Sequence, residues 1–594
     1  MNARARDPRP VVAVAGATGF VGKRLLAALN GAYRVIGLTR SPTRAAQEDP
    51  HVEWRHCDLF SMSEVEAALE GVDYAIYLVH SMLPNARLTQ ASFVDLDVLL
   101  ADNFARAAEH QGVEQILYLG GIRPDDARVS RHLASRLEVE RVLAGRATPT
   151  TALRAGIVVG PGGSSLRVLV NLVRRLPLMV LPSWTESKSA PIAIEDVVRA
   201  VQRCLGDPDA YDQAFEIGGP EAMSYREMMQ RTADELGVRR VMIPTPVFSP
   251  RLSARWVATV ARVPPELVGP LIESLEHTVL PETNWLNDWL QATGTRSFED
   301  ALRASIDEDG RPLDNPRQRL VKSDVPKIRE SRTVRSVQRL PLPDGADGAW
   351  AMDEYLRWLP RFMWPFIVVA VSGANVEFRL RFLGTLLLRL VHDYRASRLD
   401  RQLLMITGGV LADVRDRLRG RLEFREVLGG EALIAAIHDF RPTLPWYLYN
   451  LSQALVHLWV MTSFRRHLRR LAQLPLADGA RPLLPRRATA RPPPPSADAR
   501  EPTPDRAAVS ARRAQTEGRG EEGTEDSRVG DGHAPEACDV GRGSAPSPAP
   551  LTEGESNRAA SGECSMAAGP SHPATNPSPS APPGPPRRSR AGSR

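Results

Sequence analysis

Apolar runs alternate with helical patterns over the first half of the chain. The run at 11–15 predicts a buried parallel strand, and residues 23–29 after it have the apolar spacing of a helix. Further strands are predicted at 33–40, 52–57, 73–79, 115–119 and 151–159, with helices at 63–69, 93–110 and 130–143. Strands that alternate with helices in this way predict an α/β fold with a doubly wound parallel sheet.

A second domain is predicted after the polar, proline-interrupted stretch 311–331, which has the composition of a linker. A strand is predicted at 333–340, a helix at 350–362 that breaks at Pro360, and an apolar run at 366–371. The remaining elements are strands at 375–382, 386–391, 402–407, 421–428 and 432–440, and one long helix at 445–471. These elements predict an α+β domain over 332–475.

The end of the chain has a different composition. No Phe, Trp or Tyr follows Phe464, and 21 prolines occur from residue 475 onward. Without apolar side chains to bury, such a segment cannot offset its ordering entropy. We therefore expect residues 476–594 to be a disordered tail rich in Pro, Ala, Ser and Gly.

Charge and cysteine content narrow the class of function. The formal net charge is +6, but only four of the 76 basic residues are lysine, which is typical of a GC-rich genome rather than of a phosphate-binding surface. No stretch interleaves basic and aromatic residues, so we do not expect nucleic-acid binding. The four cysteines are widely scattered, which indicates neither a metal site nor a disulfide framework.

The sequence predicts no membrane span. The N-terminus lacks the apolar region of a secretory signal, so a cytoplasmic location is expected. Residues 362–371 are too few to cross a bilayer, and 446–464 contain too many polar side chains. The second segment is rich in Trp and Tyr, and four arginines follow it. It fits either an interfacial helix in peripheral contact with a membrane or a core helix with cations in its last turn.

A glycine-rich turn follows the first predicted strand and leads into the first predicted helix. Gly16 permits a tight turn, Gly19 allows close approach of a phosphate, and Gly22 allows the helix to pack against the strand. This arrangement aims backbone N–H groups and a positive helix end at a pyrophosphate. The candidate dinucleotide contacts in this turn are Gly16, Thr18, Gly19, Phe20, Val21 and Gly22.

The end of the second predicted strand bears on the choice of cofactor. Folds that prefer NAD usually place a carboxylate there to bind the ribose hydroxyls. This chain has Arg40 at that position and no carboxylate until Glu48. Arg40 is therefore a candidate partner for the 2′-phosphate of NADP, although NAD remains possible and Arg40 can also be an ordinary surface residue.

The glycine spacing resembles that of the extended and atypical short-chain dehydrogenase/reductase families, which include NmrA-like NAD(P)-binding proteins. Segments 191–197 and 215–220 resemble late signatures of the extended members. The resemblance implies an NAD(P)-binding Rossmann domain over 1–310. It also implies that Asp58 and Leu59 lie beside the adenine, and Val79 is counted among the cofactor contacts.

The chain lacks the Tyr-x-x-x-Lys pair with which the best-known members of this superfamily transfer protons. His132 and Arg136 stand at the corresponding positions, and Gly120-Gly121 occupies the usual place of the upstream serine. His132 is a candidate acid or base because an ordinary histidine titrates near neutral pH, and Arg136 is a candidate partner of the cofactor ribose. A single histidine on a helix is also commonly a packing or surface residue.

The second domain resembles the helix-grip (START-like) fold, which often encloses an apolar cavity; a solid α+β core without a ligand is the alternative. Two classes of function follow. One is an NADP-dependent reductase or dehydrogenase for an apolar carbonyl or enoyl substrate. The other is a non-catalytic NADP(H)-binding redox sensor, or an accessory subunit similar to that of respiratory complex I.

Overall fold

Seven parallel strands form the N-terminal sheet, in the order β12-β7-β6-β4-β1-β2-β3. The computed structural model describes residues 8–80, 89–124, 130–245, 257–260, 269, 272–313, 333–414 and 420–473. The strands are β1 (Val11–Ala15), β2 (Arg34–Thr39), β3 (Glu53–His56), β4 (Tyr74–Tyr77), β6 (Gln115–Gly121), β7 (Thr150–Ala155) and β12 (Ala214–Ile217). The parallel α/β arrangement predicted from the sequence is confirmed.

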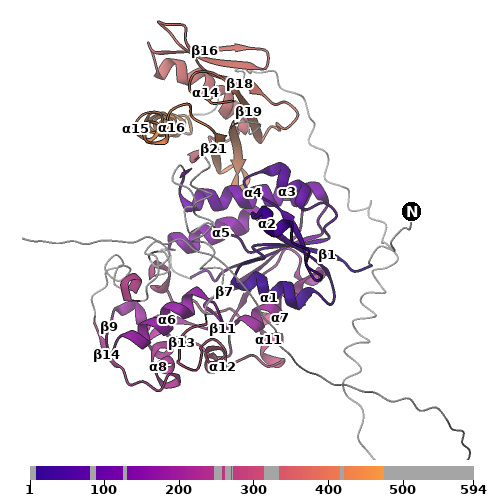
Figure 1. Cartoon of the computed structure of the whole chain (residues 1–594), viewed down its shortest axis with the longest axis vertical. Coiled ribbons are helices and arrows are strands. Elements are labelled where there is room, and N and C mark those ends of the chain that lie inside the picture. Colours follow the sequence, from indigo (N-terminus) through magenta and orange to yellow (C-terminus); the bar gives the residue numbers. More distant parts are fainter. Residues whose placement is uncertain are drawn as a thin grey trace, which may run out of the picture. The chain divides into compact units, whose positions relative to one another are not determined.

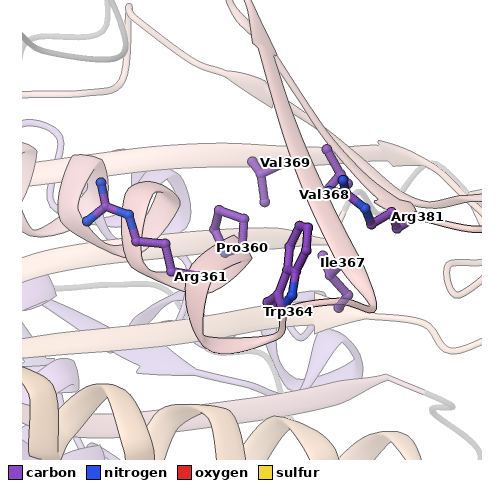
Figure 2. A pocket seen from close by; sticks show the side chains of 7 residues that line it. All are labelled: Pro360, Arg361, Trp364, Ile367, Val368, Val369 and Arg381. Carbon is purple, nitrogen blue, oxygen red and sulfur yellow. The ribbon is translucent and has the colours of Figure 1, made fainter.

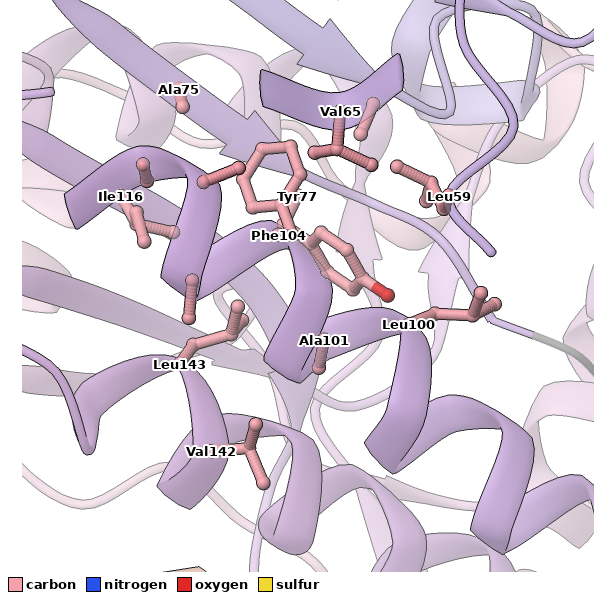
Figure 3. Packing of buried hydrophobic residues seen from close by; sticks show 14 of the residues in the cluster. Leu59, Val65, Ala75, Tyr77, Leu100, Ala101, Phe104, Ile116, Val142 and Leu143 are labelled. Atoms are coloured by element: carbon pink, nitrogen blue, oxygen red, sulfur yellow. The ribbon is translucent and has the colours of Figure 1, made fainter. Parts of the chain in front are cut away.

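Helices cover both faces of this sheet, as its purely parallel strands require. One face carries α1 (Phe20–Leu29), α7 (Ile194–Cys204) and α11 (Trp285–Ala292), and the other carries α3 (Met62–Ala68), α4 (Phe93–Gln111) and α5 (Arg131–Ala144). Figure 1 shows α1 and α7 on one side of the sheet and α3 and α4 on the other. In Figure 3, Phe104 and Leu100 of α4 face Tyr77 of β4 and Val65 of α3, which form the core between these layers.

Smaller elements extend the N-terminal part beyond the carboxyl edge of the sheet. The prediction of one continuous strand at 151–159 is wrong, because this segment divides at Gly156 into two strands, β7 and β8. A Cβ on Gly156 would lie 2.7 Å from the Ser189 hydroxyl, so the chain bends there against a neighbouring segment. The strands of this region are β8 (Val158–Val159), β9 (Leu178–Leu181), β10 (Lys188–Ser189), β11 (Ile192–Ala193), β13 (Met223–Ser224) and β14 (Val241–Pro244). Its helices are α6 (Ser164–Arg175), α8 (Tyr225–Glu235), α12 (Phe298–Arg303), η1 (Ser183–Glu186) and η2 (Pro208–Ala210).

The second sheet is mostly antiparallel and has the order β16-β17-β18-β19-β20-β21-β15-β5. Its strands are β15 (Val334–Pro341), β16 (Ile367–Ser372), β17 (Asn375–Leu380), β18 (Leu386–His392), β19 (Arg401–Gly408), β20 (Arg421–Val427) and β21 (Ala432–Phe440). The short strand β5 (Thr89–Gln90) comes from the N-terminal half and pairs in parallel with β15. The sheet therefore joins residues from both halves of the sequence.

The antiparallel sheet is buried on both faces around β21. Along β21, Leu433 and Ala435 pack against α14 (Gly348–Phe362) and α16 (Gln453–Leu471). The alternate residues Ile434 and Ala436 belong instead to the core that contains α4 and α5. Because successive side chains of a strand point to opposite faces, one strand contributes to two cores.

A buried network of charges lies where the antiparallel sheet meets α4. The guanidinium of Arg425 is 1% exposed and donates to the Asp102 carboxylate at 2.8 Å and to Glu423 at 2.8 Å. Arg106 donates to Asp102 at 2.7 Å and to Asp400 at 2.8 Å. Although burial raises the pKa of Asp102, the charges of Arg106, Arg425 and Arg146 lower it to about 2. The network therefore keeps its carboxylates charged at neutral pH.

Two expectations about the C-terminal helices are wrong. The helix predicted at 445–471 is divided into α15 (Trp446–Leu451) and α16, because Ser452 leaves the helical backbone conformation with φ −130° and ψ −84°. Its hydroxyl donates to the Leu448 carbonyl, which offers the backbone an alternative to continuing the helix. The helix predicted to break at Pro360 continues to Phe362, since a proline in the last turn removes little of the hydrogen-bond ladder.

Two further short elements are the helix α2 (Pro42–Ala45) and the turn η3 (Leu428–Gly430). The expected linker 311–331 lies mostly outside the described residues, and the expected tail 476–594 lies wholly outside them. The described residues all belong to one contact unit, Met1–Ala497. Within them, no helix is both long and apolar enough to cross a membrane.

The buried network predicts a large effect of Arg425→Ala on stability. This change leaves Asp102 and Glu423 without one of their buried cationic partners, so the free energy of unfolding should fall by about 3 to 5 kcal/mol. Denaturant titration at neutral pH measures it. In the wild type, the contribution of charged Asp102 is present above about pH 4 and is lost as the pH falls toward about 2, because its folded-state pKa is lowered.

Arg389→Ala is the matched control, since Arg389 pairs with Glu377 on the exposed part of the same sheet. Its loss should cost about 1 kcal/mol or less. Equal effects of the two substitutions would contradict a special role for the buried network.

Candidate functional site

The glycine turn between β1 and α1 is packed so closely that side chains are excluded. Gly16 has φ +88°, a conformation that favours glycine, and a Cβ there would lie 3.1 Å from the Leu78 Cβ. A Cβ on Gly22 would lie 2.4 Å from the Gly16 carbonyl oxygen and 2.8 Å from the Ala17 Cα. Gly22 therefore allows the first turn of α1 to rest directly on the end of β1.

The N-terminus of α1 lies at the carboxyl edge of the parallel sheet. Gly19 is its N-cap, and no side chain caps the helix, nor does an acidic residue stand in its first turn. The Gly19 N–H donates to the Gly16 carbonyl at 2.8 Å, which closes the turn. Such an end, with its N–H groups and positive dipole, is suited to a phosphate. Thr18 in the same turn is buried.

Phe20 and Val21 form the first helical positions of α1 and are partly buried in the core between the parallel sheet and the helices α1, α7 and α11. A second glycine-rich segment lies against Phe20, because a Cβ on Gly163 would be 3.2 Å from the Phe20 ring. Arg24 lies over the same ring at 5.1 Å and donates to the Pro161 carbonyl at 2.8 Å. The 160–163 loop is thus held beside the glycine turn.

The end of β2 is positively charged. Arg40 is exposed directly after the last residue of β2. Arg44 in α2 lies over the Trp54 ring at 4.9 Å, and Ser41 caps this short helix. No carboxylate lies between Arg40 and Glu48. Two arginines and no carboxylate therefore stand in the segment that follows β2.

The loop after β3, predicted to lie beside the adenine, is held by the antiparallel sheet. Arg335 of β15 donates to the Asp58 carboxylate at 2.8 Å and lies over the Phe60 ring at 4.4 Å. Arg421 of β20 donates to the Phe60 carbonyl at 3.1 Å. We call these two arginines and residues 58–60 the loop clamp. The sequence offered no signal for it, because residues 58 and 335 come from different predicted domains.

A third contact reaches the same loop through α4. The Asn103 side-chain amide donates to the Leu59 carbonyl at 2.8 Å, and its oxygen accepts from the Arg425 guanidinium at 2.6 Å. Leu59 itself is buried in the core shared with α3 and α4. The buried charge network and the loop clamp are therefore continuous.

His132 and Arg136 lie on α5, whose N-cap Ser130 accepts from the Leu133 N–H at 3.2 Å. Both side chains are at least partly buried. Burial, followed by the nearby charge of Arg136, lowers the pKa of His132 to about 4. The expectation that His132 titrates near neutral pH is therefore wrong, and its imidazole is neutral at pH 7.

A second histidine, which sequence reasoning missed, belongs to this group. His80 follows β4, two residues beyond Leu78, and both Arg136 and His132 act on it electrostatically. Val79, a predicted cofactor contact, lies between Leu78 and His80 in the chain and packs partly against the α3–α4 core. The position of His80 directly after a parallel strand was the signal available, because ligands bind at this edge.

The end of β6 carries Gly120 and Gly121, so no side-chain hydroxyl stands there. A Cβ on Gly120 would lie 2.8 Å from the Tyr118 ring. The Tyr118 hydroxyl is buried and donates to the Arg136 carbonyl at 3.2 Å. Burial raises the pKa of Tyr118 to about 12, so it anchors α5 rather than exchanging protons at neutral pH.

Comparison with known proteins identifies the family that this site resembles. Residues 12–218 match the NAD dependent epimerase/dehydratase family. These residues include the glycine turn, the loop after β3 and the His132–Arg136 pair. The match covers the parallel sheet and ends well before β15, where the antiparallel part of the chain begins.

Three known proteins are similar in sequence to part of this chain. The auxiliary protein GraX of Staphylococcus aureus is 32% identical over 123 residues, which are 21% of this chain and 40% of GraX. The UDP-glucose 4-epimerase of Vibrio cholerae is 21% identical over 291 residues, 45% of this chain and 88% of that protein. The ceramide reductase of Caulobacter vibrioides is 25% identical over 244 residues, 41% of this chain and 75% of that enzyme.

Two solved structures are also similar. A nucleoside-diphosphate-sugar epimerase of Staphylococcus aureus has a TM-score of 0.41 and 15% identity, covering 50% of this chain and 99% of its own. The Citrobacter triphenylmethane reductase complexed with NADP(H) has a TM-score of 0.39 and 17% identity, with the same coverage.

The loop clamp predicts that the antiparallel sheet supports cofactor binding. Arg335→Ala removes the Asp58 partner and should raise the Kd for NADPH about fivefold, the value of one lost hydrogen bond. Fluorescence titration of NADPH measures this change. Arg379→Ala, which removes a pair with Glu377 in β17, is the control and should leave the Kd unchanged. Equal affinities of the wild type and Arg335→Ala would contradict a supporting role.

Proposed function

We propose that the chain is an NADP(H)-binding reductase for an apolar carbonyl or enoyl substrate. The observation that carries this proposal is the glycine turn, where Gly22 brings an uncapped helix end against β1. The match of residues 12–218 to the NAD dependent epimerase/dehydratase family supports a nicotinamide dinucleotide. The relative named ceramide reductase supports reduction of an apolar substrate.

NADP is the proposed cofactor rather than NAD. Arg40 and Arg44 supply positive charge at the end of β2, and no carboxylate stands there to bind the ribose hydroxyls or repel a 2′-phosphate. The residues proposed to contact the dinucleotide are Gly16, Thr18, Gly19, Phe20, Val21, Gly22, Arg40, Asp58, Leu59, Val79 and Arg136.

The His132–Arg136 pair is proposed to act at the reacting end of the cofactor. When bound, the nicotinamide supplies or accepts a hydride. Arg136 holds the adjoining ribose, and His132 serves as a neutral hydrogen-bond donor to the substrate oxygen. Because the pKa of His132 is lowered to about 4, very little imidazolium is present at pH 7 to act as the acid, so solvent water supplies the proton to the substrate oxygen.

The region 332–475 is proposed to be a helix-grip domain with a solid core. Its antiparallel sheet is covered on one face by α14 and α16, the arrangement expected for that fold. Aromatic rings fill the space between them: Tyr355 lies 5.4 Å from Phe424 and 5.2 Å from Phe464, between ring centroids. This packing favours a supporting role for the domain over an internal ligand cavity.

A second candidate function is binding without turnover, as in a redox sensor or an accessory subunit. The observation that favours it is the lowered pKa of His132 together with the lack of Tyr-x-x-x-Lys in the sequence. Both candidates need the same dinucleotide site, so activity assays must separate them.

Gly19→Val tests the dinucleotide site. A side chain at Gly19 would meet only the Gly16 carbonyl, at 3.0 Å, so the protein should still fold, but it would block the approach of the pyrophosphate. NADPH binding should become unmeasurable by titration. Gly31→Val is the matched control, because nothing lies within 4 Å of a Cβ at Gly31. Unchanged NADPH affinity in Gly19→Val would refute the site.

Arg40→Asp tests the cofactor preference. It places a carboxylate beside the proposed 2′-phosphate and should weaken NADPH binding by at least about tenfold while changing NADH binding little. Isothermal titration with both cofactors measures the difference. If the unmodified protein binds NADH as tightly as NADPH, the preference is wrong although the site can stand.

His132 variants test the chemistry. If the protein reduces a carbonyl, His132→Ala should lower kcat about 10²-fold, and His132→Gln, which keeps an N–H donor, should restore part of it. Because the pKa of His132 is about 4, kcat/KM of the wild type should show no inflection from this group near pH 6 to 7. Full activity of His132→Ala would exclude the role, and no turnover with any carbonyl substrate would favour the second candidate.

A further inference from the structure

The helices α15 and α16 carry an apolar strip that faces solvent. Leu448, Leu451, Leu455 and Trp459 follow one another at spacings of three and four residues; Leu451 is 74% exposed and Trp459 is 52% exposed. The opposite side of α16, including Phe464, is already buried in the core. The strip is therefore additional to the packing of the domain, and exposed apolar patches of this kind mark interaction sites.

A second exposed apolar group lies around the hairpin of β16 and β17. Trp364 and Phe366 precede β16, while Phe382 and Leu383 follow β17, and Leu383 is 76% exposed. The Phe362 ring connects the two groups, because its centroid lies 4.7 Å from that of Trp459. We call the α15–α16 strip and this hairpin group together the aromatic face.

Arginines border the aromatic face. An open pocket of about 440 Å³ is lined by Trp364, Arg361 and Arg381 with apolar neighbours. Figure 2 shows Trp364 between Pro360 and Ile367, and the Arg381 guanidinium lies 4.1 Å from the Trp364 ring. On α16, Arg466, Arg469 and Arg470 are exposed. Neither α15 nor α16 contains an Asp or Glu.

We propose that the aromatic face docks onto the surface of an anionic lipid bilayer. Tryptophan, tyrosine and leucine side chains enter the boundary between headgroups and acyl chains, and the arginines contact lipid phosphates. The charge complementarity favours this occupant over a second copy of the chain, since two copies would bring their arginines together. The inference goes beyond the proposed function and holds whether or not the dinucleotide site is catalytic.

Flotation with lipid vesicles tests the proposal on the full chain. The protein should float with vesicles of phosphatidylcholine and phosphatidylglycerol, and much less with phosphatidylcholine alone. Raising the salt concentration should reduce binding, because each arginine near the surface contributes about fivefold in affinity. Inorganic phosphate at millimolar concentration should not compete, which distinguishes a bilayer surface from a site for free phosphate.

Leu455→Glu and the double variant Arg466→Glu/Arg469→Glu should each lower vesicle binding at least about tenfold. Leu178→Glu is the matched control, because Leu178 of β9 is 52% exposed and lies outside the aromatic face. All variants should keep the wild-type Tm and NADPH affinity, since the substituted side chains are exposed.

Three outcomes would overturn the proposal. The first is that the wild type fails to float with anionic vesicles. The second is that Leu455→Glu floats as well as Leu178→Glu. The third is that sedimentation shows a wild-type dimer, which Leu455→Glu converts to a monomer, without any vesicle binding; this result would assign the aromatic face to a second copy.

Discussion

The contact between Arg425 and Asp102 is the constraint on which the rest of the structure depends. It places a guanidinium and a carboxylate from distant parts of the sequence in a region without water, where each charge is costly alone. Burial of both is tolerated because Glu423, Arg106 and Asn103 complete their hydrogen bonds. If the antiparallel sheet separated from α4, Asp102 and Arg425 would lose each other as partners, and the apolar side chains around them would be exposed to water.

The same network reaches the candidate site. Asn103 accepts a hydrogen bond from the Arg425 guanidinium and donates one to the Leu59 carbonyl. Arg335 and Arg421 donate to the residues on either side of Leu59, which are Asp58 and Phe60. The loop expected beside the adenine is therefore fixed from two directions: by its own parallel sheet and by the antiparallel one. The proposed cofactor contacts Asp58 and Leu59 therefore depend on hydrogen bonds that also hold the two sheets together.

The two faces of the antiparallel sheet pack against different parts of the protein. The face toward α4 is occupied by charges and apolar side chains that fasten it to the parallel sheet, and α14 and α16 cover the opposite face with aromatic rings. The outer side of α16 remains apolar and is bordered by arginine. The buried side of α16 fits the core helix, one of the two alternatives that the sequence left open, and the proposed membrane contact rests on its exposed apolar side.

The sequence by itself determined the local elements. The sequence predicts a parallel sheet with a glycine turn at its carboxyl edge, from the run Val11–Ala15, the glycines that follow it and the alternation of apolar runs. These features are predictable because they depend on neighbours in the chain. The alternation Leu422-Glu423-Phe424-Arg425 likewise indicates a strand. Only the tertiary structure decided what covers the polar side of this strand, because Arg425 donates to Asp102, which lies 323 residues away in the sequence. The lowered pKa of His132 and the clamp on Asp58 have the same origin. Burial and electrostatics depend on distances in space, which spacing along the chain does not contain.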